Sequence, residues 1–118
     1  MPDSILLASP EERYEFFLAS VANGGAVWAL RCEEGWLCGE DASGHRIFPV
    51  WPSARAALGA AELLSHAPEA IPSLQWIDAW LHCLAFERTH VGVFATLASP
   101  GTVVHPGILW AQLVERMP

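Results

Sequence analysis

The sequence contains no lysine, and its six basic residues are scattered arginines. Set against 13 acidic residues, they leave a formal net charge of −7 at pH 7. A surface of this sign repels phosphate backbones and no basic cluster interrupts it, so we expect no nucleic-acid partner. An acidic surface suits a basic protein partner, although acidity also serves solubility alone.

Long uninterrupted apolar runs and targeting signals are also missing. Residues 1–10 carry an acid where a secretory signal carries basic residues, and their apolar run is too short for one. No charged residue occurs from Thr89 to Val114, but the motifs SPG and HPG break this stretch twice. A membrane-spanning helix needs about 20 apolar residues without such breaks. We therefore expect a cytoplasmic protein that does not enter a membrane.

Cysteine is sparse, and the residues that could ligate a metal are scattered. In a chain without a secretion signal, an odd set of cysteines predicts free, buried thiols; the three are Cys32, Cys38 and Cys83. The histidines show none of the close pairings typical of zinc sites; they are His45, His66, His82, His90 and His105. We expect no metal and no cofactor, although a site assembled only by folding remains open. Phosphate-binding loops and a G-x-S-x-G elbow are missing too.

Apolar residues, by contrast, are abundant. Hydrophobic residues make up 53 % of the 118-residue chain and charged residues only 16 %. This composition excludes a disordered chain and predicts one globular domain over residues 1–118. It also supplies more apolar surface than a small monomer usually buries, which favours a protein interface or a homodimer.

The first predicted element is a helix that follows Ser9. Ser9 is suited to the N-cap, Pro10 to the first helical position, and Glu12 completes an S-x-x-E capping box. The run Asn23-Gly24-Gly25 ends the helix, because glycine accepts the left-handed conformation of a C-cap.

Residues 26–50 predict a three-stranded antiparallel meander with two glycine-closed turns. The first turn places Cys32 opposite Trp36, and the second places Glu40 opposite Arg46. In this register the larger apolar side chains share one face; they are Trp28, Leu30, Cys32, Trp36, Cys38, Phe48 and Val50.

Trp51-Pro52 stops the third strand, since proline cannot donate to the ladder. Ser53 then caps an alanine-rich helix over residues 54–66, in which Ala57, Ala61 and Leu64 share a face. Residues 67–72, with two prolines, are predicted to be a linker, and Ser73 is the predicted cap of the next helix.

The remaining chain predicts a helix over residues 74–88, strands over 90–97 and 102–105, and a helix over 106–117. The element order is α-β-β-β-α-α-β-(β)-α. We therefore predict an α+β fold, in which the antiparallel three-stranded meander and one or two further strands pack with about four helices.

Several motifs resemble a known family. VWAL followed by EEGW, the segment GEDASGHRIFPVWP, and WL ahead of VGVFATL are similar to the bacterial family called domain of unknown function 2750. The resemblance extends from about Ser9 to the last helix and is most specific between Trp28 and Pro52. It implies a small single-domain bacterial protein without an assigned reaction, and it carries over no catalytic residues.

The predicted helix over residues 74–88 is apolar nearly all round, except for Gln75, Asp78 and His82. Spaced four residues apart, Asp78 and His82 meet on one helix face, where a carboxylate can orient an imidazole as a general base. No nucleophile accompanies them, so the alternative is a solvated stripe. They are the catalytic candidates of a chain that we expect to be non-enzymatic.

Six tryptophans are many for this length, and core packing explains most of them. Trp76 and Trp80 are expected to stack on one helix. Trp51, where the chain leaves the sheet, is the tryptophan that we expect to be partly exposed and available to a partner.

These observations support two hypotheses about function. The first is a non-enzymatic protein-binding or regulatory module, for example an immunity-type inhibitor, that meets a protein partner or a second copy of itself. Its candidate partner-binding residues are Glu33, Glu34, Glu40, Asp41 and Trp51. The alternative is a small-molecule-binding protein or small enzyme with a Trp-lined pocket that uses Asp78 and His82.

Overall fold

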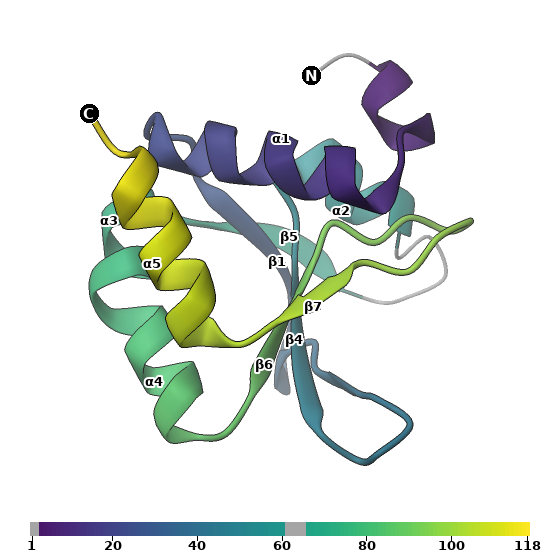
Figure 1. Cartoon of the computed structure of the whole chain (residues 1–118). Coiled ribbons are helices and arrows are strands. Elements are labelled where there is room, and N and C mark those ends of the chain that lie inside the picture. The colour runs from purple at the N-terminus through teal and green to yellow at the C-terminus, as the bar shows by residue number, and fades with distance from the viewer. Residues whose placement is uncertain (1–2, 61–65) are drawn as a thin grey trace.

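The computed structural model describes residues 3–60 and 66–118 and confirms an α+β architecture (Figure 1). The helical elements are a 3-10 helix at Asp3–Leu7, α1 (Pro10–Ala22), α2 (Ala54–Ala60), α3 (Ser73–Gln75), a π-helical turn at Trp76–Trp80, α4 (Leu81–Phe86) and α5 (Pro106–Arg116). The strands are β1 (Val27–Cys32), β2 (Gly35–Trp36), β3 (Gly39–Glu40), β4 (Arg46–Val50), β5 (Ala67–Ile71), β6 (His90–Val93) and β7 (Thr102–Val104). Ala61 and Leu64, predicted to continue α2, lie outside the described residues.

The first sheet is antiparallel, in the order β2-β1-β5. β5 pairs along β1 from Val27 opposite Ile71 to Arg31 opposite Ala67, so the prediction of a linker here is wrong. Of the two prolines that suggested a linker, Pro72 lies beyond the end of β5, and Pro68 is compatible with β5 because it is an edge strand. Only one side of an edge strand takes part in the ladder, so a missing N–H is tolerated there.

The second sheet is mixed, in the order β3-β4-β6-β7. β6 pairs parallel to β4 and antiparallel to β7, which confirms an interior strand at the start of residues 90–97. Pro49 lies within β4, although proline is rare in strands with two neighbours. It is accommodated because β3 pairs with β4 only as far as Ile47.

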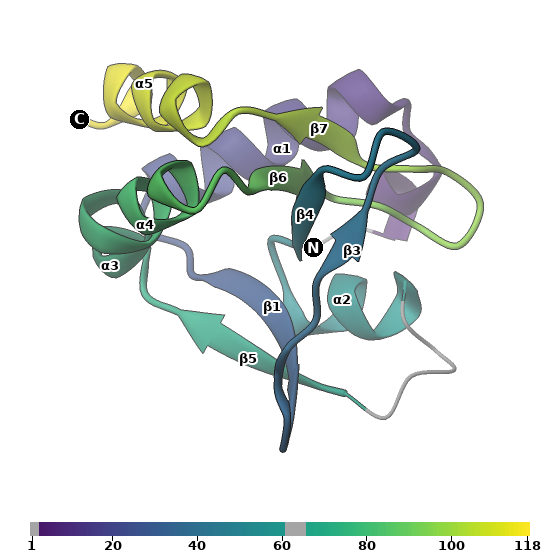
Figure 2. The same ribbon diagram turned by 90° about the horizontal axis from the view of Figure 1, so that it is seen from below.

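The predicted meander is wrong, because its strands divide between the two sheets (Figure 2). β1 and β2 form one hairpin, whereas β3 and β4 form another in the second sheet. The pairing of Glu40 with Arg46 across the second hairpin is confirmed.

The register predicted for the first hairpin is wrong by one residue. Cys32 pairs with Gly35 and Arg31 with Trp36. Gly35 adopts φ +129° and takes a place in the ladder instead of the loop. Because partners in an antiparallel pair share a face, Trp36 lies on the face of Arg31, and the Arg31 guanidinium stands 5.0 Å from the centroid of its ring.

Trp51 is buried, with 3 % of its surface exposed, so the prediction of partial exposure is wrong. Its backbone exchanges two 2.8 Å hydrogen bonds with Trp28, in a bridge that joins the end of β4 to β1. The Trp51 indole Nε1 donates to the Ala95 carbonyl at 2.9 Å. The point where the two sheets meet is thus part of the core.

α1 begins and ends where the sequence predicts. The Ser9 side chain accepts from the Glu12 amide, the Glu12 side chain completes the capping box, and Gly24 follows the helix end with φ +94°. α1 also buries a charged residue, Arg13, which is 2 % exposed. Its guanidinium donates at 2.8–3.0 Å to four neutral oxygens, on Ala8, Phe94, Ser99 and Pro100.

The predicted helix over residues 74–88 is one continuous helical segment with a π-helical turn between α3 and α4. Ser73 is its first residue and makes no capping bond; Pro72 holds the N-cap position, so the prediction of a Ser73 cap is wrong. Trp76 and Trp80 stack across the π turn with ring centroids 6.2 Å apart, as predicted. Such turns interrupt α-helices frequently at functional sites.

The core gathers side chains from both sheets and from the helices around them. α5 packs against both α1 and α4 (Figure 1).

Within residues 3–60 and 66–118, no helix is both long enough and apolar enough to cross a bilayer. The three cysteines are free, but Cys38 and Cys83 are exposed and Cys32 is only partly buried, so the prediction of buried thiols is wrong.

Candidate functional site

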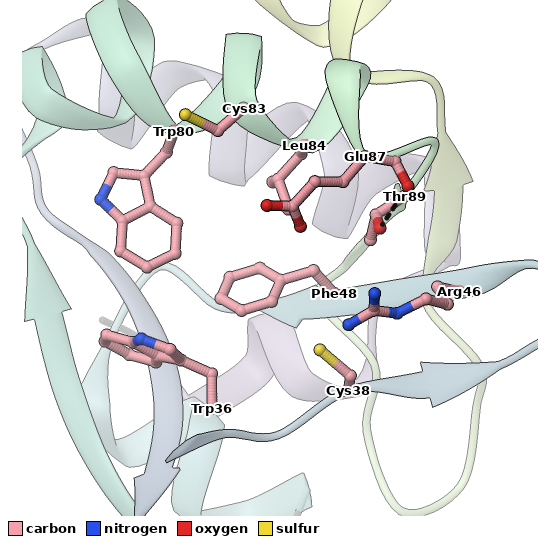
Figure 3. Close-up of a pocket in the computed structure, with 9 residues that line it drawn as sticks. All are labelled: Trp36, Cys38, Arg46, Phe48, Trp80, Cys83, Leu84, Glu87 and Thr89. Carbon is pink, nitrogen blue, oxygen red and sulfur yellow. Dashed lines mark hydrogen bonds between the residues drawn. The ribbon is translucent and has the colours of Figure 1, made fainter.

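A cleft of ≈ 280 Å³ opens between β4 and α4 (Figure 3). Its nine lining residues are Trp36, Cys38, Arg46, Phe48, Trp80, Cys83, Leu84, Glu87 and Thr89. These residues come from the first hairpin, the second hairpin, the π-helical turn, α4 and the approach to β6. The cleft therefore exists only after the two sheets and the composite helix have packed together.

Two simple periodicities build the walls of the cleft. Arg46 and Phe48 are two residues apart on β4, so their side chains leave the same face of the strand. The opposite wall uses positions separated by three and four residues on one face of the helical segment; they are Trp80, Cys83, Leu84 and Glu87.

One end of the cleft is an aromatic wall, which we define as Trp36, Phe48 and Trp80. The ring of Trp36 meets Trp80 edge-on at 5.1 Å between centroids, and Phe48 lies 5.5 Å from Trp80 and 6.0 Å from Trp36. Phe48 is buried at the base, whereas Trp36 and Trp80 are half-buried. The two tryptophans thus offer ring surface to a ligand, while the buried Phe48 ties the wall to the core.

The other end of the cleft is polar. The Arg46 guanidinium and the Glu87 carboxylate point into it from opposite walls, the carboxylate above Phe48 (Figure 3). Both residues are exposed, and within the described part of the chain neither charged group has a hydrogen-bond or ion-pair partner. A cation and an anion are therefore both available to a ligand.

Cys38 and Cys83 place a thiol on each wall of the cleft (Figure 3). The residues that line the cleft include no histidine and a single carboxylate, Glu87, to which neither thiol makes a hydrogen bond in the described structure. Without a base in contact, neither cysteine has the arrangement of an activated nucleophile.

The catalytic candidates Asp78 and His82 lie outside this cleft. Both are exposed, and no hydrogen bond or ion pair joins them in the described structure. The His82 ring instead packs against Trp110 at 6.0 Å, beside a smaller cavity of ≈ 90 Å³.

A carboxylate and an imidazole do come together elsewhere, in the turn between β3 and β4. Asp41 Oδ2 lies 3.2 Å from His45 Nδ1, and Asp41 Oδ1 accepts from the backbone amides of Ser43 and His45. The His45 backbone hydrogen bond is the main cause that lowers the pKa of Asp41 below its ordinary value. These contacts give Asp41 a role in holding the turn, beside its predicted role toward a partner.

The other acidic candidates are exposed. Glu33 and Glu34 form the connection between β1 and β2, and Glu40 lies on β3 opposite Arg46. Glu33 and Glu34 also border a shallow cavity of ≈ 570 Å³ that includes Arg31 and His66. This placement leaves their carboxylates accessible to a partner.

In the folded protein the His90 ring lies between the rings of His45 and His105. The His90 ring lies 5.7 Å from the His45 ring and 5.8 Å from the His105 ring, between centroids. His105 caps α5, because its Nδ1 accepts from the Gly107 amide at 2.9 Å. Among the residues that the structure describes, no group of three or more His, Cys, Asp or Glu side chains could hold a metal ion.

Sequence reasoning missed the polar half of the cleft. The predicted meander places Trp36, Cys38 and Phe48 on one face. It pairs Arg46 with Glu40, however, and no predicted site includes Glu87. The face spacing of Trp80, Cys83 and Glu87 was visible in the sequence. What the sequence did not contain was the pairing of β4 with β6, which brings β4 beneath α4.

Fold and cleft together define a small α+β protein with an aromatic recess between a strand and a helix. The chain belongs to the family described as Protein of unknown function (DUF2750), whose profile matches residues 14–113. The resemblance in the sequence is thereby confirmed, and all nine cleft residues fall within the match. Neither a curated protein nor a solved structure matches the chain.

Proposed function

We propose that this protein is a non-enzymatic binding module that takes an aromatic or large apolar group of its ligand into the cleft between β4 and α4. The observation that carries the proposal is the half-buried Trp36–Trp80 pair of the aromatic wall, which lies beside two charged groups, on Arg46 and Glu87, without an ion-pair partner in the described chain. Ligand sites commonly combine apolar and aromatic surface with a few polar groups that fix orientation.

The size of the cleft supports a small occupant. Its ≈ 280 Å³ lies near the lower end of the range of small-molecule pockets, about 300–1,000 Å³. A single ring with a short polar substituent fits this volume. Binding rather than catalysis is favoured because the two thiols lack a neighbouring base.

Indole resonances of the protein provide the test, with neutral benzyl alcohol as the probe. We expect the indole N–H signals of Trp36 and Trp80 to shift on titration while that of Trp110, which lies outside the cleft, stays in place. Trp36→Leu should abolish the shift of Trp80, and the matched Trp110→Leu should retain it. Equal movement of all indole signals, or movement of none, would overturn the proposal; the wild-type spectra decide this even if Trp36→Leu is unstable.

A protein partner is the second candidate for the binding role. The observation that favours it is the exposed Glu33-Glu34 connection at the tip of the first hairpin, on a chain with a net charge of −7. A partner with a basic surface would meet this tip, and a homodimer would instead cover exposed apolar side chains such as Phe86 and Ile108.

A further inference from the structure

Two opposite charges at the polar end of the cleft restrict the chemistry of its ligand. Arg46 enters from β4 and Glu87 from the end of α4, and both side chains point into the same recess (Figure 3). In the described chain neither is neutralised by a partner side chain. A ligand in this recess meets a guanidinium on one side and a carboxylate on the other.

The geometry points to a free α-amino acid with a large apolar or aromatic side chain as the ligand of this cleft, an inference that rests on the binding role proposed above. Its carboxylate would pair with the Arg46 guanidinium, whose planar fork matches a carboxylate with two hydrogen bonds. Its ammonium would donate to the Glu87 carboxylate. Its side chain would lie on the aromatic wall formed by Trp36, Phe48 and Trp80.

Each alternative leaves one of these groups unsatisfied. An anion such as a phosphate would meet Arg46 but would be repelled by Glu87. A purely cationic amine would meet Glu87 but would be repelled by Arg46. A residue inside a peptide carries neither terminal charge, and a terminal residue carries only one, so a peptide cannot satisfy both walls through one carbon atom.

The volume of the cleft agrees with this ligand class. A recess of ≈ 280 Å³ accommodates a single amino acid, whereas a nucleotide or an extended peptide exceeds it. The aromatic wall favours phenylalanine, leucine or methionine over polar amino acids. An aromatic, aliphatic or thioether side chain packs favourably on the rings of the wall, whereas a polar side chain would lose its hydrogen bonds to water there.

The experiment is calorimetric titration of the full chain with L-phenylalanine, supported by the indole spectra of Trp36 and Trp80. The comparison ligands are phenethylamine, 3-phenylpropionate, N-acetylphenylalanine and phenylalanine amide, each of which lacks one of the two charges. We expect L-phenylalanine to bind and each analogue to bind about tenfold more weakly, since each loses one charge-assisted hydrogen-bonded pair.

Arg46 and Glu87 are exposed, so we expect their substitution to leave the fold intact. Arg46→Gln and Glu87→Gln should each weaken phenylalanine about tenfold. Their controls, Arg88→Gln and Glu115→Gln, change exposed residues that do not line the cleft and should leave binding unchanged. Arg46→Gln should also make phenylalanine and phenethylamine bind equally tightly. The two ligands differ only in the carboxylate of phenylalanine, and this carboxylate has no partner in the variant.

The outcomes separate this inference from the proposed function. If an analogue with a single charge binds as tightly as phenylalanine, the inference is overturned while the cleft remains a binding site. The same holds if benzyl alcohol shifts Trp36 and Trp80 but phenylalanine does not bind more tightly than benzyl alcohol. If no ring compound moves either indole signal, both the inference and the proposed function are overturned.

Discussion

Tyr14 lies half-buried where α1 packs against α5, and its hydroxyl donates a hydrogen bond to Gln112 Oε1. Burial is the main cause that raises the pKa of this hydroxyl above 10, and the neighbouring Glu15 carboxylate acts in the same direction. Burial disfavours the charged phenolate, so the folded state holds the proton more tightly than the unfolded state does. The corresponding stability is fully present below about pH 10 and is lost as the pH rises through the folded pKa.

Because Tyr14 is the single tyrosine of the chain, its ionisation can be followed directly by tyrosinate absorbance. We expect a midpoint above pH 10 in the native protein and a return to about 10 in denaturant. Tyr14→Phe supplies the blank, since it removes the only phenol. Equal midpoints in native and denatured protein would contradict the burial seen in the structure.

Arg13 acts between elements, since it joins α1 to the chain between β6 and β7. Its Nε donates to the Phe94 carbonyl at 2.9 Å, and a second nitrogen reaches Ser99 Oγ and the Pro100 carbonyl. Phe94 is buried and adopts φ +58°, a left-handed conformation that costs energy in a bulky residue. The guanidinium therefore holds a strained segment in place.

Arg13→Met should lower the free energy of unfolding by about 2–4 kcal/mol, because it leaves several buried acceptors without a donor. Urea denaturation measures this difference. The matched Arg31→Met removes an exposed ion pair with Glu69 and the exposed contact of the guanidinium with the Trp36 ring, so it should cost less, about 1 kcal/mol. An Arg13→Met protein as stable as wild type would contradict this prediction. It would show that the free-energy cost of desolvating the guanidinium equals the stabilisation from its hydrogen bonds.

Two features that depend on local chemistry were predicted correctly from the sequence. The capping box at Ser9 and Glu12 and the pairing of Glu40 with Arg46 depend on neighbours in the chain, and both are confirmed. β5 was missed because prolines exclude a central strand but not an edge strand, and the edge position depends on tertiary pairing. The register of the hairpin formed by β1 and β2 was predicted wrongly because Gly35 is compatible with either a loop position or a position in the ladder.

The cleft was the least predictable part for the same reason. A Trp-lined pocket was expected, but with Asp78 and His82 as its polar residues; the structure places both of these outside the cleft between β4 and α4. Arg46 and Glu87 are 41 positions apart in the sequence. They face one cleft only because β4 pairs parallel to β6, whose preceding helix then crosses above β4. Arg13 gave no local signal either, since its partners are mostly backbone carbonyls.

The chain carries 13 acidic and 6 basic residues, so net charge alone attracts a basic partner, and a specific contact must depend on where the acidic residues lie. If a protein partner uses the hairpin tip, reversing Glu33 and Glu34 to arginine should abolish its capture from a native lysate of the source cell. Reversing Glu11 and Glu115, which are also exposed, changes the net charge equally and serves as the control.

We expect the control pair to retain the partner and the tip pair to lose it, with the affinity of the wild type falling as salt screens the contact. Equal loss in both pairs would show attraction by net charge only, and equal retention would exclude the tip. Size-exclusion chromatography with light scattering over a range of concentrations completes the test. A dimer that forms equally well after reversal at the tip would place the interface on the exposed apolar side chains instead, because their contact does not depend on these charges.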